Sequence, residues 1–304
     1  MTGWLDFFQG WLADLRGRHL ARRSVEQAEC WGFRWMEFCR ELGAERPAEV
    51  GRAEVAAWVR VLRSRRYAAS TLDVALRTVR AWMRWGVRRG LLLVDPTRGM
   101  RLRRPPRSSR PWLTPEEMQT LLSLPHPGTP QGLRDRAVLE TLYSAGLRGG
   151  ECCALDLEDL DLAGGLLRVR RGKGGKDRLL PLGRVHARAL VDYLTAARPR
   201  LVQDPGERAL FLTRFGTRLG LQTIQVRLRG YVKQAGFTGR LPTPHSLRHS
   251  CGTHLLQNGA DLLQIQVFLG HSHVSTTETY THLLPVDLVE EHRRCHPRAR
   301  RKGD

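Results

Sequence analysis

The chain has 304 residues, enough for two domains of ordinary size with a sizeable core in each. Its 50 basic residues outnumber its 30 acidic ones, which gives a formal net charge of +20. The sequence contains no run of about 18 apolar residues, the length that a membrane-spanning helix needs. All but four of the basic residues are arginines, which bind phosphate in a bidentate manner and stay charged at any working pH. A GC-rich genome could explain the preference for arginine over lysine but not the net charge. We therefore expect a polyanionic partner, most simply nucleic acid.

Residues 1–20 resemble a targeting segment at first sight, but they lack a basic start and carry Asp6 and Asp14 among their apolar residues. We expect instead an amphipathic helix that faces the core. The six cysteines suggest no disulfide framework, and Cys152 and Cys153 are adjacent. Without a secretion signal we expect reduced thiols and a cytoplasmic protein.

Residues 1–104 are predicted to form a helical domain. Apolar residues recur at helical spacing in WLDFFQGWLADL, VEQAECWGFRWMEFCREL, AEVAAWVRVLRSR and STLDVALRTVRAWMRWGVRRG. The last stretch places four arginines on one face, beside a tryptophan-rich apolar face: Arg77, Arg80, Arg84 and Arg88. Such a stripe suits a helix that lies on DNA, and a merely solvated face explains it equally well.

Residues 105–112 are predicted to be a basic interdomain linker, because the surrounding stretch DPTRGMRLRRPPRSSRPW is rich in Pro, Arg and Ser and has no periodicity. A helix is predicted to begin at Thr114, with Pro115 in its first turn and Glu117 completing a capping box. The second domain is therefore predicted to cover residues 113–304.

The second domain is predicted to be mixed. Helical patterns cover 114–124, 131–145, 183–197 and 221–235. Between them, EDLDL, LLRVRR and DRLLPL are short β segments separated by glycine-rich turns, which predicts a small antiparallel sheet. The fold class that follows is mainly α with a small antiparallel β-sheet, that is, α+β.

Four stretches of the second domain carry reactive side chains. GLRGGE holds Arg148 and Glu151 at helical spacing, and RGKGGKDR places a lysine at a hairpin tip. TPHSLRHSCGTHLLQNG reads as a helix capped by Thr243, so that a histidine and an arginine lie at its electropositive start. FLGHSHVSTTETYTH places a tyrosine just inside a short helix, with a histidine on the preceding turn.

Each stretch also has an ordinary structural explanation. The pair Arg148–Glu151 could be a surface ion pair, and the glycine turn could be a solvated hairpin, since its spacing does not match a nucleotide-binding loop. A zinc site is disfavoured because no standard ligand spacing occurs among His245, His249, Cys251 and His254. His254 is expected to border the core, and a tyrosine on a helix is usually a packing residue.

Taken together, the four stretches resemble the tyrosine site-specific recombinases, or phage integrase family. The matching residues, in chain order, are Arg148, Lys173, His245, Arg248, His271 and Tyr280. The match covers most of 112–304, and the ending YTHLLPVDLVEEHRRCHPRARRKGD is especially similar to Xer-type, XerC-like members. The resemblance implies a two-domain DNA clamp, with a helical domain that binds the core site and a catalytic domain.

The resemblance also implies the chemistry. Tyr280 would attack the scissile phosphate to give a 3′-phosphotyrosyl link, with no metal and no other cofactor. Arg148 and Arg248 would stabilise the phosphorane, and Lys173 would protonate the leaving 5′-oxygen. His245 would transfer a proton or contact the phosphate, and His271 would hydrogen-bond it. Glu151 would orient neighbouring basic groups, and Lys176 would contact DNA.

The implied partner is double-stranded DNA with inverted half-sites, bound by a homo-tetramer or by a hetero-tetramer with a second recombinase. Xer-type resolution of chromosome or plasmid multimers is the leading expectation. An integrase of a mobile element, a DNA-binding protein that no longer cuts and a relaxing topoisomerase are the alternatives. One departure from the family pattern is Gly149-Gly150, which costs roughly 2 kcal/mol of helix propensity relative to alanine. We therefore expect Arg148 to be held less firmly.

Overall fold

The computed structural model describes residues 3–18, 20, 22–100, 112–170, 177–238, 241–270, 290 and 292–299. The chain divides into two compact units, residues 1–108 and 109–304. The division falls inside the predicted linker 105–112, of which the structure describes residue 112 alone.

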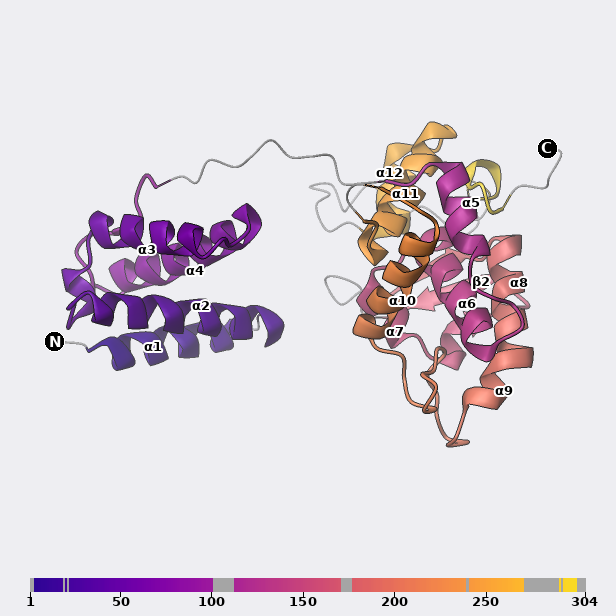
Figure 1. Ribbon diagram of the computed structural model, residues 1–304, viewed down its shortest axis with the longest axis horizontal. Coiled ribbons are helices and arrows are strands. Elements are labelled where there is room, and N and C mark those ends of the chain that lie inside the picture. Colours follow the sequence, from indigo (N-terminus) through magenta and orange to yellow (C-terminus); the bar gives the residue numbers. More distant parts are fainter. Residues whose placement is uncertain are drawn as a thin grey trace. The chain divides into compact units, whose positions relative to one another are not determined.

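Unit 1 is helical in the part of it that the structure describes (Figure 1). Its elements are α1 (Trp4–Gly17), α2 (Arg22–Glu41), the short 3₁₀ helix η1 (Pro47–Glu49), α3 (Arg52–Ser64) and α4 (Ala69–Arg88). The predicted amphipathic helix at the start is confirmed, because α1 buries six apolar side chains: Trp4, Phe7, Phe8, Trp11, Leu12 and Leu15.

Aromatic rings dominate the core of unit 1. The ring of Trp82 on α4 stacks on that of Trp11 at 5.2 Å between centroids and on that of Phe7 at 5.3 Å. The Trp82 indole nitrogen also donates to the backbone oxygen of Phe7 at 3.3 Å. Large rings bury much apolar area each, so these contacts fix α4 against α1. The apolar face of α4 is therefore buried within unit 1.

Unit 2 is a helical domain with a small sheet (Figure 1). Its helices are α5 (Pro115–Ser123), α6 (Pro130–Ser144), α7 (Gly149–Ala154), α8 (Arg184–Asp192), α9 (Arg198–Leu201), α10 (Leu221–Gln234), α11 (Pro244–Gln257) and α12 (Leu262–Leu269). A 3₁₀ turn, η2 (Leu157–Asp159), precedes the sheet, and a π-helical turn, η3 (Tyr193–Ala197), joins α8 to α9.

Among the described residues the sheet has three antiparallel strands in the order β1 (Leu160–Asp161), β2 (Leu166–Val169) and β3 (Arg178–Pro181). In the register, Leu167 pairs with Leu180 and Val169 with Arg178. Each strand lies inside one of the three predicted β segments. The α+β fold class expected from the sequence is confirmed.

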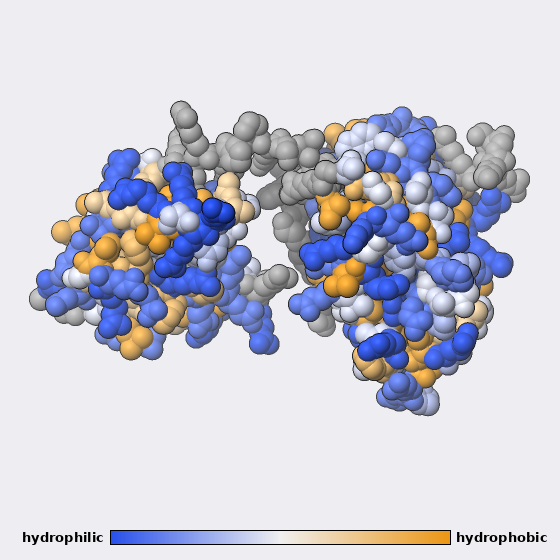
Figure 2. Space-filling view, viewed as in Figure 1, coloured by the Kyte–Doolittle hydropathy of each residue, from blue (hydrophilic) through white to orange (hydrophobic). Residues whose placement is uncertain are grey.

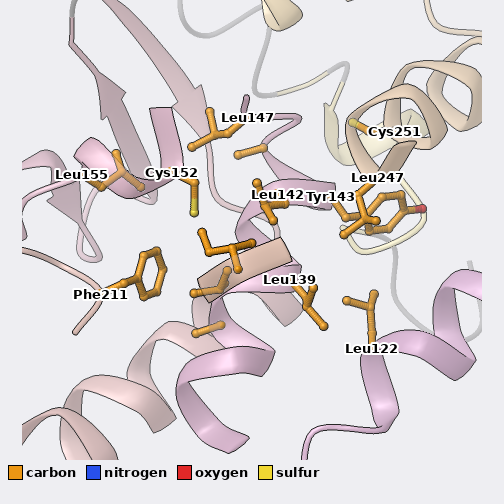
Figure 3. Packing of buried hydrophobic residues seen from close by; sticks show 14 of the residues in the cluster. Leu122, Leu139, Leu142, Tyr143, Leu147, Cys152, Leu155, Phe211, Leu247 and Cys251 are labelled. Atoms are coloured by element: carbon orange, nitrogen blue, oxygen red, sulfur yellow. The ribbon is translucent and has the colours of Figure 1, made fainter. Parts of the chain in front are cut away.

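The core of unit 2 is built around α6, which is buried over most of its length. Figure 3 shows side chains from neighbouring elements meeting there, among them Leu122 of α5, Cys152 of α7 and Leu247 of α11. The helix starts predicted from capping residues are confirmed, since Thr114 and Thr243 accept hydrogen bonds from backbone amides in the first turns of α5 and α11.

Figure 2 shows hydrophilic side chains over much of the visible face of each unit, with smaller apolar areas between them. Among the described residues, every helix is too short or too polar to cross a bilayer.

Four histidines lie buried in the core of unit 2: His186, His254, His292 and His296. The rings of His292 and His296 stack at 4.6 Å between centroids. His254 meets the Tyr143 hydroxyl at 2.8 Å, which confirms that it borders the core. Burial lowers the pKa of His186 to about 3 and that of His292 to about 4. These rings are therefore neutral in the folded state at physiological pH.

Acidification should destabilise unit 2 through these histidines. The unfolded chain binds protons at its histidines below a pH of about 6.5, whereas folded His186 and His292 do so only at much lower pH. The contribution of these histidines to the free energy of unfolding is complete above about pH 6.5. It decreases as the pH falls, by about 2 kcal/mol per histidine at about pH 5. Carboxylates whose pKa is lowered in the folded state lose their contribution to the free energy of unfolding only at a pH below the range in which the histidines act.

Hydrogen–deuterium exchange of α6 and α8 peptides at pH 7.5 and 5, corrected for intrinsic exchange rates, measures this loss. His186→Gln should reduce the difference in corrected exchange between the higher and the lower pH. His249→Gln, at an exposed position of α11, serves as the matched control and should leave the difference unchanged. Equal pH differences in wild type and His186→Gln would contradict the assignment.

Candidate active site

Arg148 stands at the N-terminus of α7, where its extended backbone makes it the N-cap residue. The two glycines that follow occupy the first helical turn, so they interrupt no helix interior. A Cβ atom on Gly149 would lie 2.5 Å from the end of the Leu221 side chain on α10, so a larger residue here would require that side chain to move. The expectation that Arg148 is held less firmly stays a prediction, although Arg148 does make hydrogen bonds to Glu151.

The Glu151 carboxylate is the centre of the site. It accepts hydrogen bonds from the Arg148 backbone nitrogen at 2.9 Å and from Arg148 Nη1 at 2.7 Å. Arg178 on β3 donates to the same carboxylate from both Nη atoms, at 3.2 and 2.9 Å. Burial alone would raise the pKa of Glu151, but the hydrogen bonds from Arg178 and Arg148 outweigh it and lower the pKa to about 2. Glu151 is therefore a carboxylate at any physiological pH.

Arg248 lies on the buried side of α11. Its Nη1 donates to the backbone oxygen of Gly146 at 2.6 Å, and its Nη2 donates to that of Leu269. Burial, and then the nearby Arg148 charge, lowers the pKa of Arg248 to about 10, so that it stays charged at neutral pH. His245, three residues earlier, is exposed on the first turn of the same helix.

The C-terminal end of α12 completes the site. Gly270 ends the helix in the left-handed conformation, with φ +63°, which glycine adopts without strain. Its carbonyl oxygen accepts from Arg148 Nη2 at 3.0 Å. Arg148 and Arg248 therefore both bind the last carbonyls of α12, and Arg248 Nη1 lies 3.9 Å from the Glu151 carboxylate.

The structure brings together three of the residues predicted from the sequence: Arg148, Glu151 and Arg248. Lys173, Lys176, His271 and Tyr280 lie outside the described residues. Two of the residues weighed above as zinc ligands lie on different faces of α11, since His249 is exposed whereas Cys251 is buried. Within the described residues no group of His, Cys, Asp or Glu side chains is arranged to hold a metal ion.

Arg178 is a site residue that the sequence reasoning missed. A signal was present, because residues two apart on a strand face the same way, and Arg178 shares a strand face with buried Leu180. A charged residue on the inward face of a strand needs a buried partner. The partner Glu151 is 27 residues away, and only the fold identifies it.

Unit 1 presents basic side chains on two helices. The predicted stripe on α4 is largely paired: Arg77 binds Asp73 at 3.2 Å, Arg84 binds Asp95 at 3.4 Å, and Arg80 donates to the Met100 backbone oxygen at 2.5 Å. A groove of about 430 Å³ runs beside α3 and is lined by Arg52, Arg60 and Arg63 among others. These three are exposed, and none pairs with a carboxylate in the part of the chain that the structure describes.

Comparison with known proteins gives one family for this chain. Residues 111–285 match the model of the phage integrase family. The chain is 38% identical over 255 residues to tyrosine recombinase XerC of Natranaerobius thermophilus, covering 83% of this chain and 84% of that protein. It is 35% identical over 309 residues to tyrosine recombinase XerC of Mycobacterium sp. (strain KMS), covering 98% of this chain and 100% of that one.

Solved structures share the fold. The chain superposes on the Tn1549 transposon integrase in complex with a circular intermediate DNA with a TM-score of 0.72 and 19% identity, over 90% of this chain and 94% of that one. A lambda integrase dimer bound to a COC′ core site gives a TM-score of 0.70 and 17% identity, over 89% of this chain and 96% of that one.

Proposed function

This chain belongs to the phage integrase family, and we propose that it recombines DNA through a 3′-phosphotyrosine formed at Tyr280. It is a tyrosine recombinase, and site-specific recombination of DNA is its activity. The specific proposal is Xer-type resolution of chromosome or plasmid multimers by a tetramer on two synapsed sites. The length of the match to XerC proteins of two organisms favours this role over that of a mobile-element integrase.

The roles proposed for the site residues follow from charge. The phosphorane carries extra negative charge on its non-bridging oxygens, which the forked guanidiniums of Arg148 and Arg248 suit. Lys173 supplies the proton to the leaving 5′-oxygen, and His245 and His271 contact the phosphate or move the nucleophile's proton. The 5′-hydroxyl of the partner strand then attacks the phosphotyrosine, so the energy of the bond is kept.

The observation that carries the proposal is the convergence of Arg148 and Arg248 at the end of α12, next to one carboxylate. With Arg178, three guanidiniums meet a single carboxylate, so the cluster has an excess of positive charge for an anion. His271 follows Gly270 directly in the sequence, and the described part of the Leu-Gly-His motif, Leu269 and Gly270, lies at this end of α12.

In unit 1 we propose that the α3 groove contacts the DNA backbone. Its three exposed arginines are not neutralised by carboxylates among the described residues, unlike Arg77 and Arg84 of the α4 stripe. Unpaired cations release more counterions from DNA on binding, so they set the salt dependence of affinity.

The double variant Arg60→Ala/Arg63→Ala should flatten the salt dependence of DNA binding. The slope of log K against log salt should fall by about two, because each lost phosphate contact removes about one counterion. Fluorescence anisotropy between 50 and 200 mM salt, roughly the range over which such binding weakens steeply, measures it. Arg77→Ala/Arg84→Ala is the matched pair from α4 and should change the slope less. A larger change in the slope for Arg77→Ala/Arg84→Ala than for Arg60→Ala/Arg63→Ala would assign the DNA contact to α4 instead.

Covalent capture tests the proposed function. The protein is incubated with sheared genomic DNA from its own source and denatured, and the protein-linked fragments are sequenced. Adducts at one or a few sites are expected, and their positions separate chromosome maintenance from a mobile element.

Other outcomes would overturn the proposal. Adducts scattered without sequence preference would indicate a relaxing topoisomerase. DNA footprints without adducts would indicate a DNA-binding protein that does not cut.

A further inference from the structure

Arg178 contacts the same carboxylate as the phosphate-binding Arg148. Its two Nη atoms bracket Glu151 in a bidentate pair, at 3.2 and 2.9 Å. Arg148 donates to the same carboxylate from its backbone nitrogen and from Nη1. Both carboxylate oxygens therefore accept from both arginines, so the plane of Glu151 depends on Arg178 as much as on Arg148.

Burial makes this arrangement rigid. The exposed fraction is 13% for the Arg178 side chain and 11% for that of Glu151, whereas that of Arg148 is 33%. Arg148 thus reaches from a fixed, buried pair toward a more open position. A carboxylate held on two sides keeps the guanidinium it orients in one place, which is what preorganised binding of a transition state requires.

Arg178 also adjusts the charge that Arg148 offers. If Glu151 faced Arg148 alone, the carboxylate would neutralise it and compete with phosphate for its donors. The second cation shares the carboxylate, so the positive charge of Arg148 remains available.

Arg178 further contacts the end of α12. A Cβ atom placed on Gly270 would lie 3.3 Å from the Arg178 guanidinium carbon, so this side chain packs against the turn. The carbonyl of the same glycine accepts from Arg148 at 3.0 Å. One arginine therefore supports both partners of Arg148, the carboxylate and the carbonyl.

We propose that Arg178 is a positioning residue for strand cleavage, which fixes Glu151 and the Gly270 turn so that Arg148 is held for the scissile phosphate. The inference rests on the proposed function of Arg148. In this role its effect on the reaction passes through Arg148, because its two Nη atoms both donate to the carboxylate that Arg148 also contacts.

The test is a double-mutant cycle on the full chain, using single-turnover formation of the covalent adduct at saturating DNA. Arg178→Met should slow the adduct about tenfold, and Arg178→Lys, which keeps the charge but not the fork, about threefold. In an Arg148→Ala background Arg178→Met should cost less than about twofold, because residues that act through one another are not additive. For Arg178→Met and Arg178→Lys in the otherwise wild-type chain, the Kd for DNA should stay within about twofold.

Arg218→Met is the matched control. Arg218 contacts the other end of α7, where it donates to the carbonyls of Cys153 and Leu155 at 3.1 and 3.0 Å and pairs with Asp156. Its loss should lower stability and leave the adduct rate within about twofold. A full tenfold loss on Arg178→Met in the Arg148→Ala background, or a Kd that rises by the same factor, would overturn the proposal.

A wild-type chain that forms no Tyr280-dependent adduct would contradict the proposed function instead. The inference about Arg178 is then decided by the DNA-free crystal structure of Arg178→Met. Arg148 displaced from Glu151 and from the Gly270 carbonyl would support it, whereas unchanged contacts would refute it.

Discussion

Tyr280→Phe should abolish covalent protein–DNA adducts while leaving DNA affinity within about twofold, because the substitution removes only the attacking hydroxyl. The chain has five tyrosines, and the structure accounts for the hydroxyls of the other four. Tyr67 accepts from Arg34, Tyr143 meets His254, Tyr193 donates to Leu210, and Tyr231 donates to Asp135. Each of these four hydroxyls therefore has a hydrogen-bond partner within the fold, and Tyr280 stays the nucleophile that we propose from the family resemblance.

Burial also makes two of those four poor nucleophiles. It raises the pKa of Tyr193 and that of Tyr231 to about 12, so their phenolates are scarce at neutral pH. Tyr231→Phe is therefore the matched control. It removes a hydrogen bond to Asp135 and should lower the free energy of unfolding by about 1 kcal/mol without reducing adducts. Adducts that persist in Tyr280→Phe, detected by denaturing electrophoresis, would assign the chemistry to another residue.

Local signals carried the fold predictions that the structure confirms. Thr114 and Thr243 cap helices through hydrogen bonds to amides three residues on, so the prediction needs no knowledge of the rest of the chain. The sheet followed from glycine-rich turns and strand composition for the same reason. Arg148 and Glu151 are three residues apart, and a capping-box geometry brings them together whatever surrounds them.

The features that were missed or misjudged depend on contacts between distant residues. Gly149 was judged by helix propensity alone, whereas the fold places it beside Leu221, 72 positions away along the printed sequence, whose side chain a Cβ atom would meet. Of the buried histidines only His254 was placed at the core, since the others meet partners such as Ser144, 148 residues from His292. The pairing of Arg84 within the α4 stripe was not predicted, because its partner Asp95 lies on a separate segment.

Arg248→Ala should lower the rate of adduct formation about 10²–10³-fold, equivalent to about 3–4 kcal/mol in the transition state. The Arg248 side chain is more buried than that of Arg148, and burial strengthens the attraction of its charge to a phosphorane. It also donates to the carbonyls of Gly146 and Leu269, so its removal leaves two backbone oxygens without these donors and lowers stability. Rate and stability must therefore be separated.

Charge on the substrate separates them. A methylphosphonate at the scissile position lacks one charged oxygen, so cleavage of it needs less cationic stabilisation. Arg248→Ala should regain most of its lost rate relative to wild type on this substrate. Arg227→Ala, which breaks a pair with Asp135 away from the Glu151 carboxylate, should lose stability and show no such recovery. An Arg248→Ala defect that is identical on phosphate and methylphosphonate would mean that Arg248 only supports the end of α12.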